Sequence, residues 1–142
     1  MKTKMILAMG LCAAIGLGSP QFTRAQNKAE PGEKHETMKI PDTVDGIIQD
    51  IHKHHQELTD TVKAKQLAEV HQHAFAIREL AKALPAKANP QMKKMVENAV
   101  KRVSQLAEDL DKSGDAGDQA KTEANLKKMD AALKTLEEHA TM

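Results

Sequence analysis

Between residues 42 and 140 the apolar side chains recur every three or four positions and form four successive stripes. Residues with this spacing lie on one face of an α-helix. No β-rich run of alternating apolar and polar residues competes with this interpretation. The stripes extend from Val44 to Val62, from Leu67 to Leu84, from Met92 to Leu110 and from Thr122 to Ala140.

Residues typical of turns separate the later stripes. The second stripe stops at Pro85 in the segment PAKANP, and the third runs into DKSGDAGD. Both segments have the composition of a loop between helices. Asn89 is expected to cap the third helix, with Pro90 at its first position, and Asp42 to cap the first helix.

The boundary between the first two helices is less obvious, since no glycine or proline lies between their stripes. The second stripe is rotated by about a quarter turn relative to the first, so one straight helix could not bury both on one partner. We therefore expect a tight turn within residues 59–65, with a single fused helix as the alternative. The sequence predicts an all-α fold, an antiparallel up-down four-helix bundle over residues 42–140.

The first 25 residues have the order of a secretory signal peptide. Lys2 and Lys4 precede an apolar run over residues 5–18, and Thr23 and Ala25 occupy the small-residue positions before a cleavage site. The apolar run is shorter than the roughly 20 residues that span a bilayer. We expect this segment to be removed, which leaves no membrane span in the mature chain. Residues 26–41 are polar and without period, and they are predicted to be a disordered linker.

The cysteine and charge content narrow the class of protein. Cys12, the only cysteine, lies inside the predicted signal peptide, so the mature chain would have no disulfide, no thiolate ligand and no CxxCH haem attachment. An exported chain without disulfides fits a periplasmic location. Removal of residues 1–25 leaves 18 basic and 20 acidic side chains, and Phe75 as the only aromatic one. This composition excludes the basic surface of a nucleic-acid-binding protein.

Histidine is the residue type most suggestive of chemistry. Five of the seven histidines lie between residues 52 and 73, in the motifs HKHH and HQH. A helical projection places His55 and His73 on the inward faces of the first two helices, with His52, His54 and His71 beside them. If the chain reverses near residue 62, the two groups reach one level of the bundle. These five histidines are therefore candidate ligands for Cu(II), Zn(II) or Ni(II), which imidazole suits.

Carboxylates near these histidines could complete such a site. Asp50 and Glu69 lie four residues before His54 and His73, where they could orient the imidazoles as outer ligands. Two further residues at a similar height, Glu108 and Glu123, are additional candidates. The alternative is a structural cluster of solvated and hydrogen-bonded histidines, and His35 and His139 are interpreted as incidental.

Two other metal motifs carry less weight. The segment from Asp109 to Ala120 has the first ligands and the glycine of a calcium loop, but Ala120 occupies the position of the bidentate glutamate. The methionines Met92, Met95 and Met129 could in principle hold Cu(I), but methionine more often fills gaps in a core. We interpret both segments structurally.

The plan of an exported domain with four antiparallel helices over residues 42–140 resembles the soluble periplasmic b-type cytochromes. That resemblance implies haem held by a methionine early in the first helix and a histidine near the end of the last. His139 matches the histidine, whereas Met38 lies before the first helix and His52 lies too far along it. Haem is accordingly an unlikely cofactor. The segment IHKHHQEL also resembles haemerythrin-like helices, but the required HxxxE is absent, so di-iron chemistry is not transferred.

The sequence as a whole predicts a periplasmic transition-metal-binding protein for metal buffering, sensing or resistance. No nucleophile elbow, paired inward carboxylates or phosphate loop points to an enzyme. The alternatives are a non-catalytic, chaperone-like bundle that binds another envelope protein, and a haem b electron carrier. Apolar residues off the main stripes, Phe75, Met95 and Val100, are compatible with a homodimer.

Overall fold

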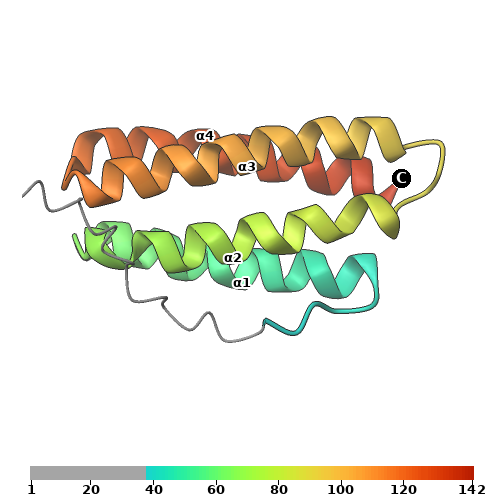
Figure 1. Ribbon diagram of the computed structural model, residues 1–142, viewed down its shortest axis with the longest axis horizontal. Coiled ribbons are helices and arrows are strands. Elements are labelled where there is room, and N and C mark those ends of the chain that lie inside the picture. The colour runs from blue at the N-terminus through green and yellow to red at the C-terminus, as the bar shows by residue number, and fades with distance from the viewer. Residues whose placement is uncertain (1–37) are drawn as a thin grey trace, which may run out of the picture. The chain divides into compact units, whose positions relative to one another are not determined.

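The computed structural model describes residues 38–142, which fold into four α-helices and two short 3-10 turns (Figure 1). No strand occurs among these residues, so the prediction of an all-α fold with four helices is confirmed. The predicted signal peptide and residues 26–37 of the predicted linker lie outside the described residues. The helices are α1 (Val44–Lys63), α2 (Val70–Ala83), α3 (Lys93–Asp115) and α4 (Gln119–Thr141).

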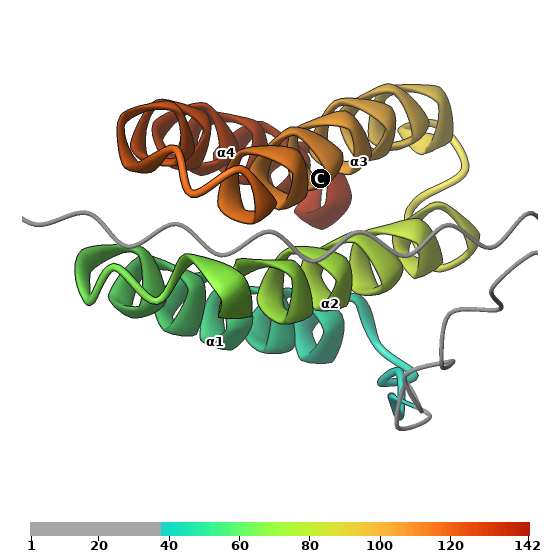
Figure 2. The same ribbon diagram turned by 60° about the vertical axis from the view of Figure 1, so that its left-hand side comes forward.

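Each helix packs against the next one along the chain, and α1 also contacts α4. Figures 1 and 2 both show α1 and α2 side by side as one pair and α3 and α4 as the other. The four predicted stripes meet in one core between these pairs. Full burial of a large aliphatic side chain contributes about 1.5–3 kcal/mol. The largest fully buried side chains include Ile47, Ile51, Leu58, Ile77, Leu80, Leu84, Leu110, Met129 and Leu136.

The first two helices are separate, as the rotation between their stripes predicted. Lys65 adopts a positive φ of 60°, and its N–H donates to the carbonyl of Val62 at 3.1 Å. A 3-10 turn over Leu67–Glu69 then leads into α2. The chain reverses only at the end of the predicted window of residues 59–65, because α1 continues to Lys63. Thr61 and Val62 are buried in this last turn of α1, so the helix extends as far as it has side chains to bury.

The predicted cap of α1 is wrong by one residue. Thr43, not Asp42, is the N-cap, and its hydroxyl accepts a hydrogen bond from the N–H of Gly46 at 3.1 Å. Asn89 was predicted to cap the third helix. Its side-chain oxygen does accept a hydrogen bond from the N–H of Gln91 at 3.0 Å, but this bond stabilises a turn before the helix and does not cap the helix itself. Regular α3 begins only at Lys93.

The first glycine of DKSGDAGD, Gly114, is a packing position and not the start of a loop. Helix α3 continues to Asp115, and Ser113 and Gly114 are buried within it. A Cβ on Gly114 would lie 2.8 Å from the carbonyl oxygen of Leu67, so only glycine allows this approach of α3 to the 3-10 turn. The chain leaves the helix at Gly117, which has a φ of 65°.

This arrangement also contradicts the calcium-loop motif. Asp109, Asp111 and Ser113 lie inside a regular helix, where they cannot wrap around a single ion as a calcium loop does. Asp118 instead caps α4, since its carboxylate accepts from the N–H of Lys121 at 3.0 Å. None of the helices between residues 38 and 142 is both long enough and apolar enough to cross a bilayer.

Candidate metal centre

One group of side chains between α1 and α2 has the composition and spacing of a metal site. His54 and Glu57 lie three residues apart on α1, a spacing that places them on the same face, and His73 faces them from α2. One carboxylate oxygen, Oε2 of Glu57, lies 3.1 Å from Nδ1 of His54 and 3.3 Å from Nδ1 of His73. One potential ligand atom from each of the three residues lies within 4.8 Å of the others.

The group sits at the edge of the core, neither sealed nor fully exposed. The side chains of His54, Glu57 and His73 are 27%, 40% and 21% exposed. The two imidazole rings are 6.0 Å apart between centroids and tilted by 40°. The group is thus partly shielded from water, and an ion could still reach it from solvent.

The buried nitrogen of His54 supports this interpretation. Its Nδ1 is inaccessible to solvent and makes no hydrogen bond, although a carboxylate oxygen of Glu57 lies 3.1 Å away. A buried polar group without a partner costs about 1–3 kcal/mol. A metal ion coordinated by that nitrogen would remove this cost.

Burial also prepares His73 to act as a ligand. The pKa of His73 is lowered from its ordinary value of 6.5, chiefly because burial disfavours the charged imidazolium. The charge of Glu57 opposes this shift, that of His54 reinforces it, and Glu69 opposes it more weakly. His73 is therefore neutral at pH 7, the form that donates a lone pair to a metal.

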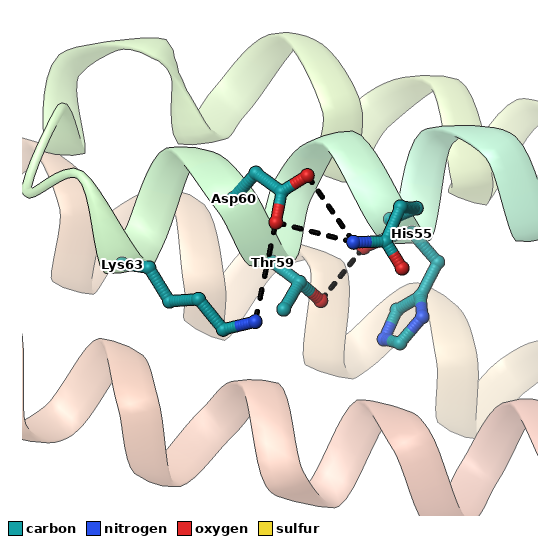
Figure 3. Close-up of polar contacts among 5 residues, drawn as sticks. His55, Thr59, Asp60 and Lys63 are labelled. Carbon is teal, nitrogen blue, oxygen red and sulfur yellow. Dashed lines mark hydrogen bonds and ion pairs between the residues drawn. The ribbon is translucent and has the colours of Figure 1, made fainter.

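The predicted pairing of His55 with His73 does not occur. His55 faces α4, and its Nε2 lies 2.6 Å from the Asp130 carboxylate. Figure 3 shows the His55 ring on the side of α1 away from the α2 ribbon, one turn before Thr59, whose hydroxyl donates to the His55 carbonyl at 2.8 Å. The projection failed here because α1 contacts both α2 and α4, so inward-facing residues divide between two partners.

The remaining two predicted ligands also lie apart from the group. His52 is 55% exposed, and its Nε2 lies 3.2 Å from the carboxylate of Glu137 on α4. His71 donates from Nδ1 to the carbonyl of Ala68 at 2.8 Å, and its ring meets Phe75 edge-on. The structure thus joins two of the five candidate histidines in one site and directs the other three elsewhere.

The carboxylate in the site was not predicted, although the sequence held a signal for it. The outer-ligand candidates, Asp50 and Glu69, are not members of the three-residue group found within residues 38–142. Glu69 still acts on His73 through its charge, and Glu123 accepts a hydrogen bond from Gln119 at 2.6 Å. The spacing of Glu57 three residues after His54 could have identified it, since such pairs share a helix face.

Two imidazole nitrogens and a carboxylate oxygen suit borderline divalent ions such as Zn(II), Cu(II) and Ni(II). Three protein ligands leave a coordination position for water or another molecule. The His54–Glu57–His73 group could therefore hold a metal ion. Comparison with protein-family models, with curated proteins and with solved structures finds no match to this chain.

Proposed function

We propose that this chain is a periplasmic protein that binds a divalent transition metal at His54, Glu57 and His73. One observation carries the proposal: a single carboxylate oxygen lies within 3.3 Å of imidazole nitrogens from two different helices. Zn(II), Cu(II) and Ni(II) are the ions that this donor set favours. The role would be metal buffering, sensing or resistance.

The fold supports a binding site that connects two helices. In Figure 1 the colour gradient runs to one end along α1 and returns along α2, and it does the same for α3 and α4. We therefore infer an antiparallel up-down bundle, in which a bound ion would link α1 to α2 about two turns from their shared connection. An ion that binds the folded state alone raises its stability.

The proposed location and the proposed lack of catalysis rest on the sequence. The charged, apolar and small-residue order of the first 25 residues supports export. The sequence contains no nucleophile elbow, paired inward carboxylates or phosphate loop that would point to catalysis. We infer metal binding rather than turnover.

The test is calorimetric titration of the full chain, purified without a histidine tag, with Zn(II), Cu(II) and Ni(II). We expect one ion to bind with a dissociation constant below about 10 μM, which corresponds to roughly 7 kcal/mol. His54→Gln and His73→Gln should each abolish this binding. His52→Gln is the matched control, because it removes an exposed histidine of the same helix that contacts α4.

Two results would contradict the proposal. One is the absence of any heat of binding and of any metal-dependent rise in melting temperature for all three ions. The other is unchanged binding by the chain that carries both His54→Gln and His73→Gln. In that case the imidazoles contribute only to packing between α1 and α2.

A further inference from the structure

Soft thioether side chains also occur at the end of the α3–α4 pair where α3 begins and α4 ends. Five methionines occur within residues 38–142, and three of them, Met92, Met95 and Met142, lie where α3 begins and α4 ends. Met129 alone is fully buried in the core. Met95 is 45% exposed and Met142 is 72% exposed, so the interpretation of methionine as core filler does not apply to them.

Hydrogen bonds between α3 and α4 show which residues of the two helices face each other. Asn125 donates from its side chain to the carbonyl of Asp109 at 3.1 Å, and Thr122 donates to the Ser113 hydroxyl at 3.0 Å. Residues two heptads away on each helix return to nearly the same face. His139 lies two heptads after Asn125, and Met95 lies five full helical turns before Ser113, whose side chain contacts α4. His139 and Met95 therefore face each other across the same interface.

The other two methionines, Met92 and Met142, lie at the same end of the bundle. Met92 is the N-cap residue of α3, and its partly buried side chain packs against the hydrophobic core. Met142 follows His139 by three residues and is the C-cap residue of α4. Figure 1 shows this C-terminal end at the same end of the bundle as the first turns of α3. Three thioethers and one imidazole thus lie at the same end of the α3–α4 pair.

His139 provides an independent sign that a ligand is bound there. Its Nδ1 is inaccessible to solvent and has no hydrogen-bond partner, although the ring as a whole is half-buried. Buried polar atoms are normally paired, and an exception calls for an explanation such as a bound ion. The neighbouring methionine sulfurs cannot supply a strong hydrogen bond.

We propose that Met92, Met95, His139 and Met142 bind Cu(I). Thioether sulfur is a soft ligand that selects Cu(I) over hard and borderline divalent ions, and imidazole binds copper as well. The unbranched methionine side chains at a frayed helix end can move to complete the coordination. This centre is separate from the His54–Glu57–His73 group and does not depend on it.

The experiment is an anaerobic competition between the full, untagged chain and bicinchoninate for Cu(I), with ascorbate as the reductant. We expect the chain to remove one Cu(I) from the chelator. The triple variant Met92→Leu, Met95→Leu, Met142→Leu should weaken Cu(I) binding by at least about tenfold, or 1.4 kcal/mol. His139→Gln should weaken it as well, and copper X-ray absorption should show sulfur neighbours in the unchanged chain.

The control variants separate this centre from the other site and from general damage. Met129→Leu alters the buried methionine of the core and should leave Cu(I) binding unchanged. The double variant His54→Gln, His73→Gln should lose divalent ions but keep Cu(I). Circular dichroism should show that the triple methionine variant folds, since leucine conserves the volume of methionine.

Three outcomes would overturn the proposal. The first is failure of the unchanged chain to compete for Cu(I) at all. The second is a folded triple methionine variant that binds Cu(I) as tightly as the unchanged chain. The third is loss of Cu(I) binding in the His54→Gln, His73→Gln chain, which would place Cu(I) at the divalent site.

Discussion

Substitution of Gly114 by alanine tests the packing that joins α3 to the α1–α2 connection. The new Cβ would lie 2.8 Å from the carbonyl oxygen of Leu67 and 3.2 Å from Cβ of Val70. The first contact is with backbone, so it cannot be relieved by a side-chain rotation. Either α3 or the 3-10 turn over Leu67–Glu69 must move to accommodate the methyl group.

Two opposing effects set the magnitude. Alanine in a helix interior is favoured over glycine by about 1 kcal/mol, whereas an extra methyl group in a packed core costs about 1–3 kcal/mol. Because the clash at Gly114 involves a backbone atom, we expect its cost to lie near the upper end of that range. The net loss should then be about 1–2 kcal/mol. For a domain of about 100 residues, this lowers the melting temperature by about 4–15 °C.

Thermal unfolding followed by circular dichroism measures this change. Gly117→Ala is the contrasting variant: it has no atom within 4 Å of the new Cβ but has a φ of 65°, so it tests backbone strain without a clash. A melting temperature of Gly114→Ala equal to or above that of the unchanged chain would refute the reasoning. It would mean that α3 does not approach the turn as closely as the structure shows.

Three further predictions concern the site and its cofactor. Because the pKa of His73 is lowered in the folded state, the unfolded chain binds more protons than the folded chain near this pKa. The contribution of His73 to the stability of the metal-free protein should therefore be complete above pH 6.5 and be lost as the pH falls below it. Urea unfolding from pH 7.5 to 5 measures this loss, and His73→Gln should make the stability less dependent on pH. Glu57→Gln removes a charge that raises the pKa of His73, so NMR titration should find that pKa lower still, and calorimetry should find divalent binding weakened by at least about tenfold. Addition of haemin should leave the Soret band of free haemin unshifted, whereas a shifted and sharpened band that is lost on His139→Gln would instead support a haem carrier.

Much of the fold follows from local pattern. Each of the four apolar stripes became a helix, because a stripe with helical spacing can be buried only if the segment is helical. The ends of the helices were harder to place. Thr43 replaced Asp42 as the cap of α1, and α3 ran on to Asp115 through a segment that has the composition of a loop. Tertiary contacts at Gly114 determined the second difference.

The site was predictable only in part. The density of histidines in HKHH and HQH pointed to α1 and α2, the two helices that carry the His54–Glu57–His73 group, since composition is visible without a fold. The choice of His54 over His55 as the neighbour of His73 was not visible. Adjacent residues on a helix differ by about 100° in direction, and the direction matters only once the positions of α2 and α4 around α1 are known.

The sequence by itself determined that residues 42–140 form helices, how many helices there are, and that histidine is the enriched residue type with ligand chemistry. These properties depend on residues close together in the chain. Only the tertiary structure decided that Glu57 lies between His54 and His73, that His55 and His52 turn to α4, and that Thr122 pairs with Ser113 across α3 and α4. Such contacts join residues that are distant in sequence, so they depend on how whole helices are placed against one another.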